Sequence, residues 1–563
     1  MNTATSAGTD GSPPSGVESA ASPSIPSMAP APTGRARGVL SQAVTVLAGL
    51  VVLAVFLVPG PEHATLAAVL RIPVEALLGL GLVLAVPARW RRLVALVVGG
   101  ALGLWAVLRI VDVGFFAVLS RPFDPVLDWS FLSSGVRVLE RSMGSVRATG
   151  VVVAAVVAAL AVVTLVAVSV RRLGFLASRH RRRSAQALGA LSVVWIVCAA
   201  TGAQVVDGVP VAGRDYLERI GGLGASLRDG AAYQQQLADD AYRDAPADAL
   251  LTALRGRDVV IVLVESYGRV ALEHPRIAPE VTAVLRSGAD RLAAAGFAAR
   301  SGFLTSPTAG GGSWLAYASL LSGTWVDNQR RYQSLADSDR LPLAGAFRRA
   351  GWRTVAVMPG VTLGWAEGPW YAFDDIYEFQ DLGYAGPLYC FDTMPDQYVL
   401  SVFHRIRSAR PGPVMAVIPL MSSHAPWTPV PELLDWAEIG DGSVYAAPTE
   451  ALQPAEIVLQ RDAGRVQADY RRAVGYSLST VLSYVEEYGD DDLVLVFLGD
   501  HQPAPVVTGS TDNRDVPISL VTRDPEVMAL IADWGWVDGL VPGADAPVWR
   551  MDEFRDRFLA AFA

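Results

Sequence analysis

Four polar side chains, far apart in the sequence, have the types and positions that metal-assisted nucleophilic chemistry requires. Glu265 directly follows the apolar run DVVIVLV, and the pair Asp500 and His501 directly follows the apolar run DLVLVFLG. Ser313 follows three glycines and opens the apolar stretch WLAYASLLSG. Carboxylate and imidazole ligands suit Mn²⁺, Mg²⁺ or Zn²⁺, and a hydroxyl beside such an ion can attack phosphorus or sulfur as an alkoxide. These residues are therefore suited to hold one divalent metal ion beside a nucleophile.

The two apolar runs predict strands of a buried sheet. They span residues 258–264 and 492–499 and are continuous rather than alternating, which is typical of a parallel sheet covered on both faces. In such sheets ligands bind beyond the carboxyl ends of the strands. Because Glu265 and the Asp500–His501 pair each stand at such an end, we expect the sheet to bring them together.

Strands and helices alternate along the rest of the C-terminal part. Further strands are expected at 353–359, 413–419 and 517–522, and helices at 278–296, from Ser313 onward and around 466–488. This alternation predicts an α/β fold with a mainly parallel central sheet.

Ser313 and His424 also have structural interpretations. A serine at the start of a helix is often a simple N-cap, although a glycine-rich turn before it lets a substrate approach the free amide groups of the helix. The metal-ligand types elsewhere in the chain favour the catalytic interpretation of Ser313. His424, in MSSHAPW, follows the strand expected at 413–419. It could protonate a leaving group or bind a phosphoryl oxygen, whereas a lone histidine is more often structural.

The N-terminal part of the chain predicts a membrane region. Hydrophobic residues make up 52% of the chain, because five apolar segments precede residue 207, each close to the roughly 20 residues that cross a bilayer. They lie near 38–58, 65–87, 93–115, 148–170 and 186–206. The expected domains are a disordered tail (1–34), a five-helix transmembrane region (35–206), linker helices (207–254) and an extracytoplasmic catalytic domain (255–563).

Arginines predict the orientation of these spans. They gather before the first span, between the second and third, and between the fourth and fifth, which all fall on one side of the membrane if there are five spans. The positive-inside rule makes that side cytoplasmic. The N-terminus is then cytoplasmic, and the catalytic domain of this multi-pass protein lies outside. The arginines concerned are Arg35, Arg37, Arg89, Arg91, Arg92, Arg171, Arg172, Arg179, Arg181, Arg182 and Arg183.

Two pairs of opposite charges lie inside the predicted spans. Arg71 and Glu75 are four residues apart on the second span, and Arg109 and Asp112 are three apart on the third, so that each pair shares a helix face. Charges inside a membrane often mark a substrate path. The favoured interpretation is that the two members of each pair neutralise one another near the interface.

Composition excludes some classes of protein. The net charge of −9 argues against a general nucleic-acid binder. The only two cysteines, Cys198 and Cys390, lie in different parts of the chain, so neither an internal disulfide nor a thiolate metal site is expected.

Four motifs together resemble a known group of enzymes. ESYG, GGGSWLAYASLLSG, SSHAPW and GDHQP, in this order and spacing, resemble the alkaline-phosphatase/sulfatase superfamily over about residues 255–525. The similarity is greatest to lipoteichoic acid synthase-like phosphoglycerol transferases, with phosphoethanolamine transferases somewhat further off. The resemblance implies one metal ion, manganese first and magnesium or zinc as alternatives, and His424 as a substrate-contacting histidine. It implies these metal ligands: Glu265, Ser313, Asp500 and His501.

Ser313 would also be the nucleophile, in place of the threonine that is usual in these synthases. Ser306 and Thr308 are weaker candidates, because neither opens the helix. The segment GWAEGPWYAFDDIY (364–377) resembles the one whose tryptophan and arginine hold glycerol phosphate. Trp365 fits the tryptophan, but Glu367 stands at the place of the arginine, and a carboxylate repels phosphate. We therefore expect Glu367, with Trp365 and Trp370, to bind a cationic or hydroxyl-rich headgroup.

The sequence thus predicts a membrane-anchored, metal-dependent phosphotransferase. It would move a phospho-alcohol headgroup from a membrane lipid to a cell-envelope glycan or glycolipid through a covalent phosphoserine. Two alternatives remain, a sulfatase-like hydrolase (phosphatase or phosphodiesterase) with water as acceptor, and a non-catalytic membrane scaffold that retains the fold. A formylglycine sulfatase is not expected, because residues 305–309 lack the necessary Pro and Arg spacing.

Overall fold

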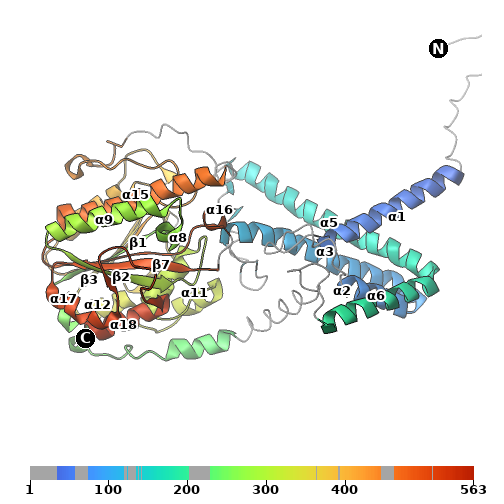
Figure 1. The fold of residues 1–563 in the computed structure, drawn as a ribbon, viewed down its shortest axis with the longest axis horizontal. Coiled ribbons are helices and arrows are strands. Elements are labelled where there is room, and N and C mark those ends of the chain that lie inside the picture. Colours follow the sequence, from blue (N-terminus) through green and yellow to red (C-terminus); the bar gives the residue numbers. More distant parts are fainter. Residues whose placement is uncertain are drawn as a thin grey trace, which may run out of the picture.

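The computed structural model describes residues 34–57, 74–119, 144–201 and 229–563, apart from 363, 391–392, 446–461 and 510–511, together with a few isolated positions between 123 and 143. Figure 1 shows that they form two parts, a group of long helices from the N-terminal region and an α/β domain that contains the C-terminus. The tail expected at 1–34 lies outside the described residues, except that Gly34 begins the first helix.

A nine-stranded sheet forms the centre of the α/β domain. Its first five strands in spatial order are all parallel, and beyond them β7 is antiparallel to both of its neighbours. The predicted α/β class and mainly parallel sheet are therefore confirmed. The spatial order is β4 (Asp375–Glu378), β3 (Arg353–Met358), β5 (Val414–Leu420), β1 (Asp258–Val264), β6 (Leu493–Gly499), β7 (Asp515–Thr522), β2 (Ala298–Thr305) and β8 (Val537–Asp538), with β9 (Val548–Arg550) paired to β2.

The register of the three central strands aligns their carboxyl ends. Val264, the last residue of β1, pairs with Leu420 of β5 on one side and with Gly499 of β6 on the other. The chain therefore leaves all three strands at the same level of the sheet. Glu265 and Asp500, the next residues of β1 and β6, stand side by side as a direct consequence.

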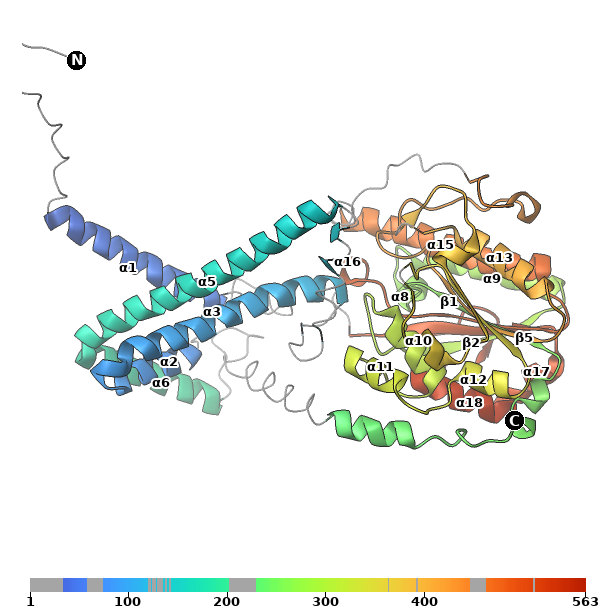
Figure 2. The same ribbon diagram turned by 180° about the vertical axis from the view of Figure 1, so that it is seen from behind.

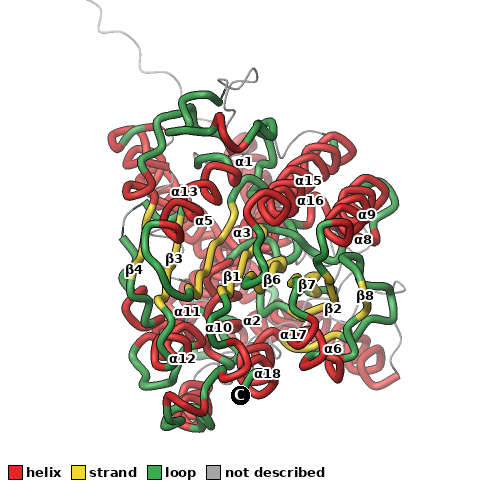
Figure 3. The backbone as a smooth tube through the Cα atoms, turned by 90° about the vertical axis from the view of Figure 1, so that its left-hand side faces the viewer, coloured by secondary structure: helices red, strands yellow, loops and turns green. Residues whose placement is uncertain are grey.

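Helices cover both faces of the sheet, as Figure 3 shows. Alternate residues of β1 belong to two different hydrophobic cores: Val259, Ile261 and Leu263 to one, and the residues between them to the other. This burial on both faces explains why the strand is continuously apolar. The first core contains α10 (Ser313–Ser322), α11 (Gln329–Ala336), α12 (Leu343–Arg349) and α18 (Phe554–Ala561), and the second contains α9 (Ala278–Ala294), α13 (Asp396–Ser408) and α15 (Ala463–Tyr488).

Strand β2 has no clear signal in the sequence. It reads AARSGFLT, in which small and polar residues precede the only two large apolar side chains, Phe303 and Leu304. No continuous run or regular alternation marks it, because part of this strand stays partly exposed. Its position is fixed by pairing with β7 instead.

The segment before the sheet is only partly helical. Residues 229–238 are helical, whereas the chain from 239 to 254 makes turns and two short 3-10 helices, Ala247–Ala249 and Thr252–Leu254. Residues 207–228 of the predicted linker lie outside the described residues. Leu250, Leu251 and Leu254 are buried in the first core of the domain.

Two helical stretches of the N-terminal part are long and apolar enough to cross a membrane, Ala88–Phe115 and Ser145–Arg179. They belong to α3 (Ala88–Leu119) and α5 (Ser145–Arg179), and large apolar side chains such as Leu104 and Leu160 are exposed on them, which suits contact with lipid. By length and composition, these two helices could therefore cross a membrane.

The number of spans stays a prediction. The apolar stretches Val39–Val55 of α1 (Gly34–Leu57) and Ala76–Ala85 of α2 (Val74–Ala85) are shorter than a full span. The fifth predicted span, near 186–206, overlaps α6 (Arg181–Thr201) over residues 186–201. Residues 58, 65–73 and 202–206 of the predicted spans lie outside the described residues.

Asp112 has a local partner near the end of α3. Its side chain is buried, and its Oδ1 atom accepts a hydrogen bond of 3.1 Å from the backbone N–H of Phe123. The guanidinium of Arg109 lies 5.1 Å from the ring centroid of Trp105. These contacts favour a structural part for both charges. Arg71 and the side chain of Glu75 lie outside what is described.

Candidate active site

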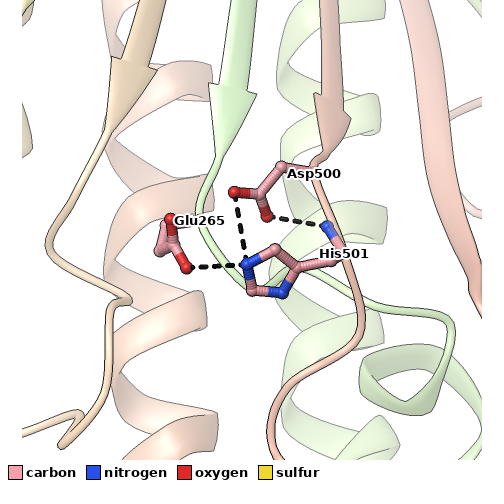
Figure 4. A group of neighbouring side chains, drawn as sticks. All are labelled: Glu265, Asp500 and His501. Atoms are coloured by element: carbon pink, nitrogen blue, oxygen red, sulfur yellow. Dashed lines mark hydrogen bonds and ion pairs between the residues drawn. The ribbon is translucent and has the colours of Figure 1, made fainter. Parts of the chain in front are cut away.

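The structure brings together the side chains of Glu265, Ser313, Asp500 and His501. Ser313 Oγ donates to Glu265 Oε2 at 2.9 Å and lies 3.2 Å from His501 Nε2. His501 Nε2 is also 3.2 Å from Glu265 Oε1 and 3.7 Å from Asp500 Oδ2 (Figure 4). Ligand atoms of Glu265, Asp500 and His501 all lie within 4.8 Å of one another, and the three residues are buried. This compact group is called the four-residue cluster below.

The loops after β1 and β6 interlock to form the cluster. A Cβ atom on Gly499 would stand 1.8 Å from the carbonyl oxygen of Tyr267, and one on Gly268 would stand 2.0 Å from Gln502 Oε1. A side chain at either position would meet backbone: the carbonyl group of Tyr267 at Gly499, and at Gly268 the Cα atom of Gln502 at 2.8 Å in addition to its side chain. The glycines in ESYG and GDHQ therefore allow the carboxylates of Glu265 and Asp500 to approach each other.

The glycine-rich turn delivers Ser313 from the other side. Gly310, Gly311 and Gly312 all have positive φ angles, and Gly310 N–H donates to Gln502 O at 2.8 Å. This bond joins the turn to the residue after His501. The N-cap of α10 is Gly312, and Ser313 directs its hydroxyl to Glu265 instead of capping the helix. The N-cap interpretation of Ser313 is therefore wrong.

The two weaker nucleophile candidates have other contacts. Ser306 Oγ donates to the backbone oxygen of Asp500 at 2.6 Å, and Thr308 Oγ1 donates to the backbone oxygen of Gly311 at 2.5 Å. Both hydroxyls thus stabilise the turn. Among these three hydroxyl groups, Ser313 is the one that contacts the carboxylate and imidazole side chains.

Hydrogen bonds within the cluster turn lone pairs toward its centre. His501 Nδ1 lies 2.8 Å from the carbonyl oxygen of Gln502, which can only accept, so Nδ1 carries the proton and Nε2 faces Glu265 and Ser313. Asp500 Oδ1 accepts from the backbone N–H groups of Ser266 and His501, both at 2.8 Å. Asp500 Oδ2 is buried without a hydrogen-bond partner. A buried carboxylate oxygen of this kind is costly unless a cation binds it, so the cluster fits a divalent metal ion.

The acid-base properties of the cluster are strongly altered. Burial and the neighbouring Glu265 carboxylate raise the pKa of Asp500 to about 7. Burial opposes the charged form of His501, but the carboxylates of Asp500 and Glu265 overcome it and raise the pKa of His501 to about 9. Burial also opposes ionisation of Glu265, yet the positive charges of His501 and His424 hold its pKa below the usual value. Perturbed groups of this kind gather at functional sites.

His424 lies near the cluster on the turn after β5. Its Nδ1 atom donates to the backbone oxygen of Ala425 at 2.6 Å, and its charge lowers the pKa of Glu265. The preceding residue, Ser423, donates from Oγ to the backbone oxygen of Glu265 at 2.6 Å. The turn is held by Asp396, a fully buried carboxylate whose Oδ1 accepts from Met421 N and Ser422 N, both at 2.8 Å.

Trp365, Glu367 and Trp370 belong to a neighbouring aromatic group. Trp365 Nε1 donates to Tyr332 Oη at 3.1 Å, and the rings of Trp365 and Trp370 lie 4.6 Å and 4.8 Å from that of Tyr371. Burial, with a contribution from the Glu367 carboxylate, raises the pKa of Tyr332. Among the described residues, the side-chain hydrogen bond of Trp365 and the ring contacts of both tryptophans are with this aromatic group rather than with the four-residue cluster.

Sequence reasoning missed two residues that adjoin the cluster. Ser266 hydrogen-bonds to both carboxylates, and the signal for it was its place directly after Glu265. Tyr317 is buried one helical turn after Ser313, and burial with the carboxylates of Asp500 and Glu265 raises the pKa of its phenol well above the usual value. Its spacing of four from Ser313 puts both side chains on one helix face.

The fold and the cluster together define a class, the α/β domains of the alkaline phosphatase superfamily. Residues 257–514 match the family described as Sulfatase, so the chain carries a sulfatase-family domain. The superfamily predicted from the four sequence motifs is thereby confirmed. No curated protein sequence matches the chain.

Several solved structures are similar to parts of the chain. The lipoteichoic acid synthase LtaP from Listeria monocytogenes has 16% identity and a TM-score of 0.36, covering 55% of this chain and 72% of its own. The lipooligosaccharide phosphoethanolamine transferase EptA from Neisseria meningitidis, an integral membrane protein, has 13% identity and a TM-score of 0.46, covering 85% of each chain. The phosphoglycerol transferase GacH from Streptococcus pyogenes, in complex with sn-glycerol-1-phosphate, has 13% identity and a TM-score of 0.33, covering 59% of this chain and 91% of its own.

Proposed function

We propose that this protein transfers a phospho-alcohol headgroup from a membrane lipid to a hydroxyl of a cell-envelope glycan or glycolipid. The observation that supports this best is the placement of the Ser313 hydroxyl, which lies 2.9 Å from a carboxylate oxygen of Glu265 and 3.2 Å from Nε2 of His501. A hydroxyl held between a carboxylate and an imidazole can lose its proton and act as a nucleophile.

Glu265, Asp500 and His501, with Ser313, are the residues that would hold a divalent metal ion. Their close approach and the unpartnered Asp500 Oδ2 support this assignment. Manganese is the ion expected, and magnesium and zinc are the alternatives, because the donors are oxygen atoms and one imidazole. When bound, the ion would favour the ionised form of Ser313 and offset the charge that develops on the phosphoryl oxygens.

The proposed reaction has two displacement steps at phosphorus. Ser313 Oγ gives its proton to solvent and attacks the phosphorus of the lipid headgroup, a bond from phosphorus to Oγ forms, and the bond to the diglyceride oxygen breaks. His424 delivers the proton that this leaving oxygen needs. An acceptor hydroxyl then attacks the phosphoserine and gives its proton to His424, the bond from phosphorus to Oγ breaks, and Ser313 regains its hydrogen from solvent.

A lipid donor is supported by the side of the domain on which the cluster lies. Helix α16 (Pro505–Thr508) begins four residues after His501 and contacts α3 of the membrane region. Figure 2 shows α16 between the sheet domain and one end of α3 and α5. We propose that this end is extracytoplasmic, with a cytoplasmic N-terminus and several spans, so that the cluster is near lipid headgroups at the outer surface.

The proposed headgroup is cationic or rich in hydroxyl groups. Glu367 lies beside Tyr332 and Tyr371. The negative charge of its carboxylate would repel a bare phosphate. Ethanolamine and glycerol headgroups have the chemistry that such a carboxylate can bind. Replacing Glu367 with arginine should shift donor preference away from phosphatidylethanolamine, and an unchanged preference would contradict the assignment.

The test uses the purified full chain in vesicles with headgroup-labelled phosphatidylglycerol or phosphatidylethanolamine, Mn²⁺ and a glycolipid acceptor. We expect labelled acceptor and a phosphorylated Ser313 detected by mass spectrometry. Ser313→Ala should lower turnover about 10³-fold or more, whereas Ser313→Thr retains the hydroxyl and should stay active. Label released only into water would indicate a hydrolase. Undiminished turnover in Ser313→Ala, or none in the unmodified protein, would refute the proposal.

A further inference from the structure

Ser266 contacts both candidate carboxylate ligands. Its backbone N–H donates to Asp500 Oδ1 at 2.8 Å, and its hydroxyl donates to Glu265 Oε1 at 3.0 Å. The residue is 3% exposed, so both bonds are shielded from water. Hydrogen bonds to charged groups are stronger than neutral ones, and in a buried site they fix the orientation of the acceptor.

The two bonds leave the other oxygen of each carboxylate turned toward the centre of the cluster. Glu265 Oε2 accepts from Ser313, and Asp500 Oδ2 is the atom without a hydrogen-bond partner, 3.7 Å from His501 Nε2. Ser266 therefore touches one oxygen of each carboxylate. The other oxygen of Glu265 faces the nucleophile and the other oxygen of Asp500 faces the imidazole, while Glu265 Oε1 itself also lies 3.2 Å from His501 Nε2.

The backbone of Ser266 has a conformation that serine rarely adopts. Its φ angle is +57°, in the left-handed region where glycine is favoured. Its carbonyl oxygen accepts from Tyr470 Oη at 2.9 Å and from Gly268 N at 2.9 Å, which holds the turn in this state. Glycine would suit this backbone better, but it would lack the hydroxyl that reaches Glu265. Strained residues of this kind concentrate at functional sites.

We propose that Ser266 is a positioning residue that sets the orientation of both Glu265 and Asp500 for metal binding. Its hydroxyl fixes Glu265, its amide fixes Asp500, and the left-handed backbone makes both contacts possible from one residue. The proposal rests on the metal-dependent function proposed above. It makes a specific claim about side-chain chemistry: metal affinity depends on the hydroxyl of Ser266, whereas stability depends on its backbone conformation.

Three substitutions separate these two properties. Ser266→Ala removes the hydroxyl and keeps the unfavourable φ angle. Ser266→Gly removes the hydroxyl and relieves the φ angle, and Ser266→Thr keeps the hydroxyl but adds a branched Cβ where the backbone is least tolerant. The full chain in detergent is titrated with MnCl₂ by calorimetry, and its melting temperature is measured without metal.

We expect the affinity for Mn²⁺ to fall about fivefold in Ser266→Ala and Ser266→Gly, the usual effect of one lost hydrogen bond. Ser266→Thr should keep its affinity. The melting temperature should follow a different order, with Ser266→Gly above Ser266→Ala and Ser266→Thr lowest. Unchanged affinity in the alanine and glycine variants, or affinity that follows the melting temperature across all three, would overturn the proposal.

Ser301 supplies a matched control. It lies on β2, and its buried hydroxyl bonds to Ser519 Oγ of β7 at 2.7 Å and to the backbone oxygen of Gly539 at 2.6 Å. Ser301→Ala should lower the melting temperature and leave Mn²⁺ affinity unchanged. If Ser301→Ala lost as much Mn²⁺ affinity as Ser266→Ala, the loss in Ser266→Ala would be due to general destabilisation, and the positioning role would be refuted. The outcome is distinct from that of the transfer assay, because a protein whose Mn²⁺ affinity depends on the Ser266 hydroxyl but which transfers no headgroup would refute the function alone.

Discussion

At the scale of single residues, Asp500 is the least satisfied group of the four-residue cluster. One carboxylate oxygen accepts two backbone N–H groups, and the other is buried without a hydrogen-bond partner. An uncompensated buried oxygen costs about 1–3 kcal/mol. Such an arrangement is explained if the residue binds a cation, because the ion supplies the missing partner and reverses the repulsion between Asp500 and Glu265.

These altered pKa values predict how metal binding depends on pH. Without metal, the pKa of His501 is raised to about 9 and that of Asp500 to about 7, so at pH 6 both residues carry a proton. A metal ion must displace these protons, and its affinity therefore falls as the pH falls. From pH 6 to pH 7 we expect a rise in Mn²⁺ affinity of roughly tenfold to a hundredfold, one factor of ten for each proton displaced. Calorimetry in buffers of different ionisation enthalpy measures the protons released.

The matched control for this pH dependence is His501→Gln, which removes one of the titrating ligands. The slope of log affinity against pH should decrease by about one over this range, because one proton fewer is displaced. A slope that stays the same in the variant, or an affinity in the unmodified protein that is constant from pH 6 to pH 8, would contradict the assignment of His501 and Asp500 as ligands.

The sequence predicts some of these residues much better than others. Glu265, Asp500 and His501 could be found because each follows an apolar run that is buried on both faces, and Ser313 because three glycines precede it. Ser266 had only its place directly after Glu265 as a signal, since no sequence pattern shows that a serine will adopt a positive φ angle. The contacts of an individual hydroxyl depend on the tertiary structure, which local patterns do not determine.

At the scale of structural elements, the site depends on how closely two strand-end loops approach. The loop after β1 touches the end of β6 at Gly499, where the carbonyl oxygen of Tyr267 occupies the space of a Cβ atom. The register of β1 and β6 aligns their ends, but this contact brings the carboxylates into one cluster. The apolar runs in the sequence predicted the two strands, whereas this close contact could be recognised only in the structure.

Gly499→Ala should therefore disrupt both the fold and the metal site. The added methyl group would lie 1.8 Å from backbone, which cannot move away as a flexible side chain would. We expect a loss of about 1–3 kcal/mol or more in the free energy of unfolding, from overpacking, together with weaker Mn²⁺ binding. Thermal unfolding and a Mn²⁺ titration of the purified chain measure the two effects.

Gly475 provides the matched control for this substitution. It lies in α15, and a Cβ atom there would meet no other atom within 4 Å. Gly475→Ala should raise stability by about 0.5–1 kcal/mol, because alanine favours the helix, and should leave Mn²⁺ affinity unchanged. If Gly499→Ala behaved like Gly475→Ala, the interlocking of the loops would not be what forms the site.

At the scale of the whole molecule, the segment that precedes the sheet packs against the α/β domain. The sequence predicted linker helices at 207–254, and this segment contributes these side chains to the first hydrophobic core: Tyr233, Leu237, Leu250, Leu251 and Leu254. Asp240 and Arg555 form an ion pair of 2.9 Å in which both side chains are fully buried. Arg340 donates to the backbone oxygens of Gln236 and Asp239. A segment in which charged and apolar residues are mixed resembles a linker in the sequence. The structure is needed to show that its charged side chains have buried partners in the domain.

A fragment of residues 229–563 should consequently be much more stable than one of residues 255–563. The shorter fragment removes Asp240 from its buried ion pair with Arg555, which keeps its ion pair with the more exposed Asp556 carboxylate, and breaking a buried pair costs up to about 3–5 kcal/mol. It also loses Tyr233, Leu237 and Leu250 from the first hydrophobic core. Soluble yield and chemical denaturation of the two fragments check this expectation, and equal stability would show that the segment is only a connector.

The same two-part architecture predicts a difference between soluble and membrane substrates. The 229–563 fragment keeps the four-residue cluster but lacks α3, which α16 contacts beside that cluster in the full chain. Chemistry on a short-chain, monomeric lipid should therefore be similar in the fragment and the full chain. Turnover of the same headgroup presented in vesicles should fall at least about tenfold in the fragment, because the cluster is no longer held at the bilayer surface and the gain in effective concentration is lost. Equal rates on vesicles would mean that the membrane helices serve another purpose than presenting the lipid to Ser313.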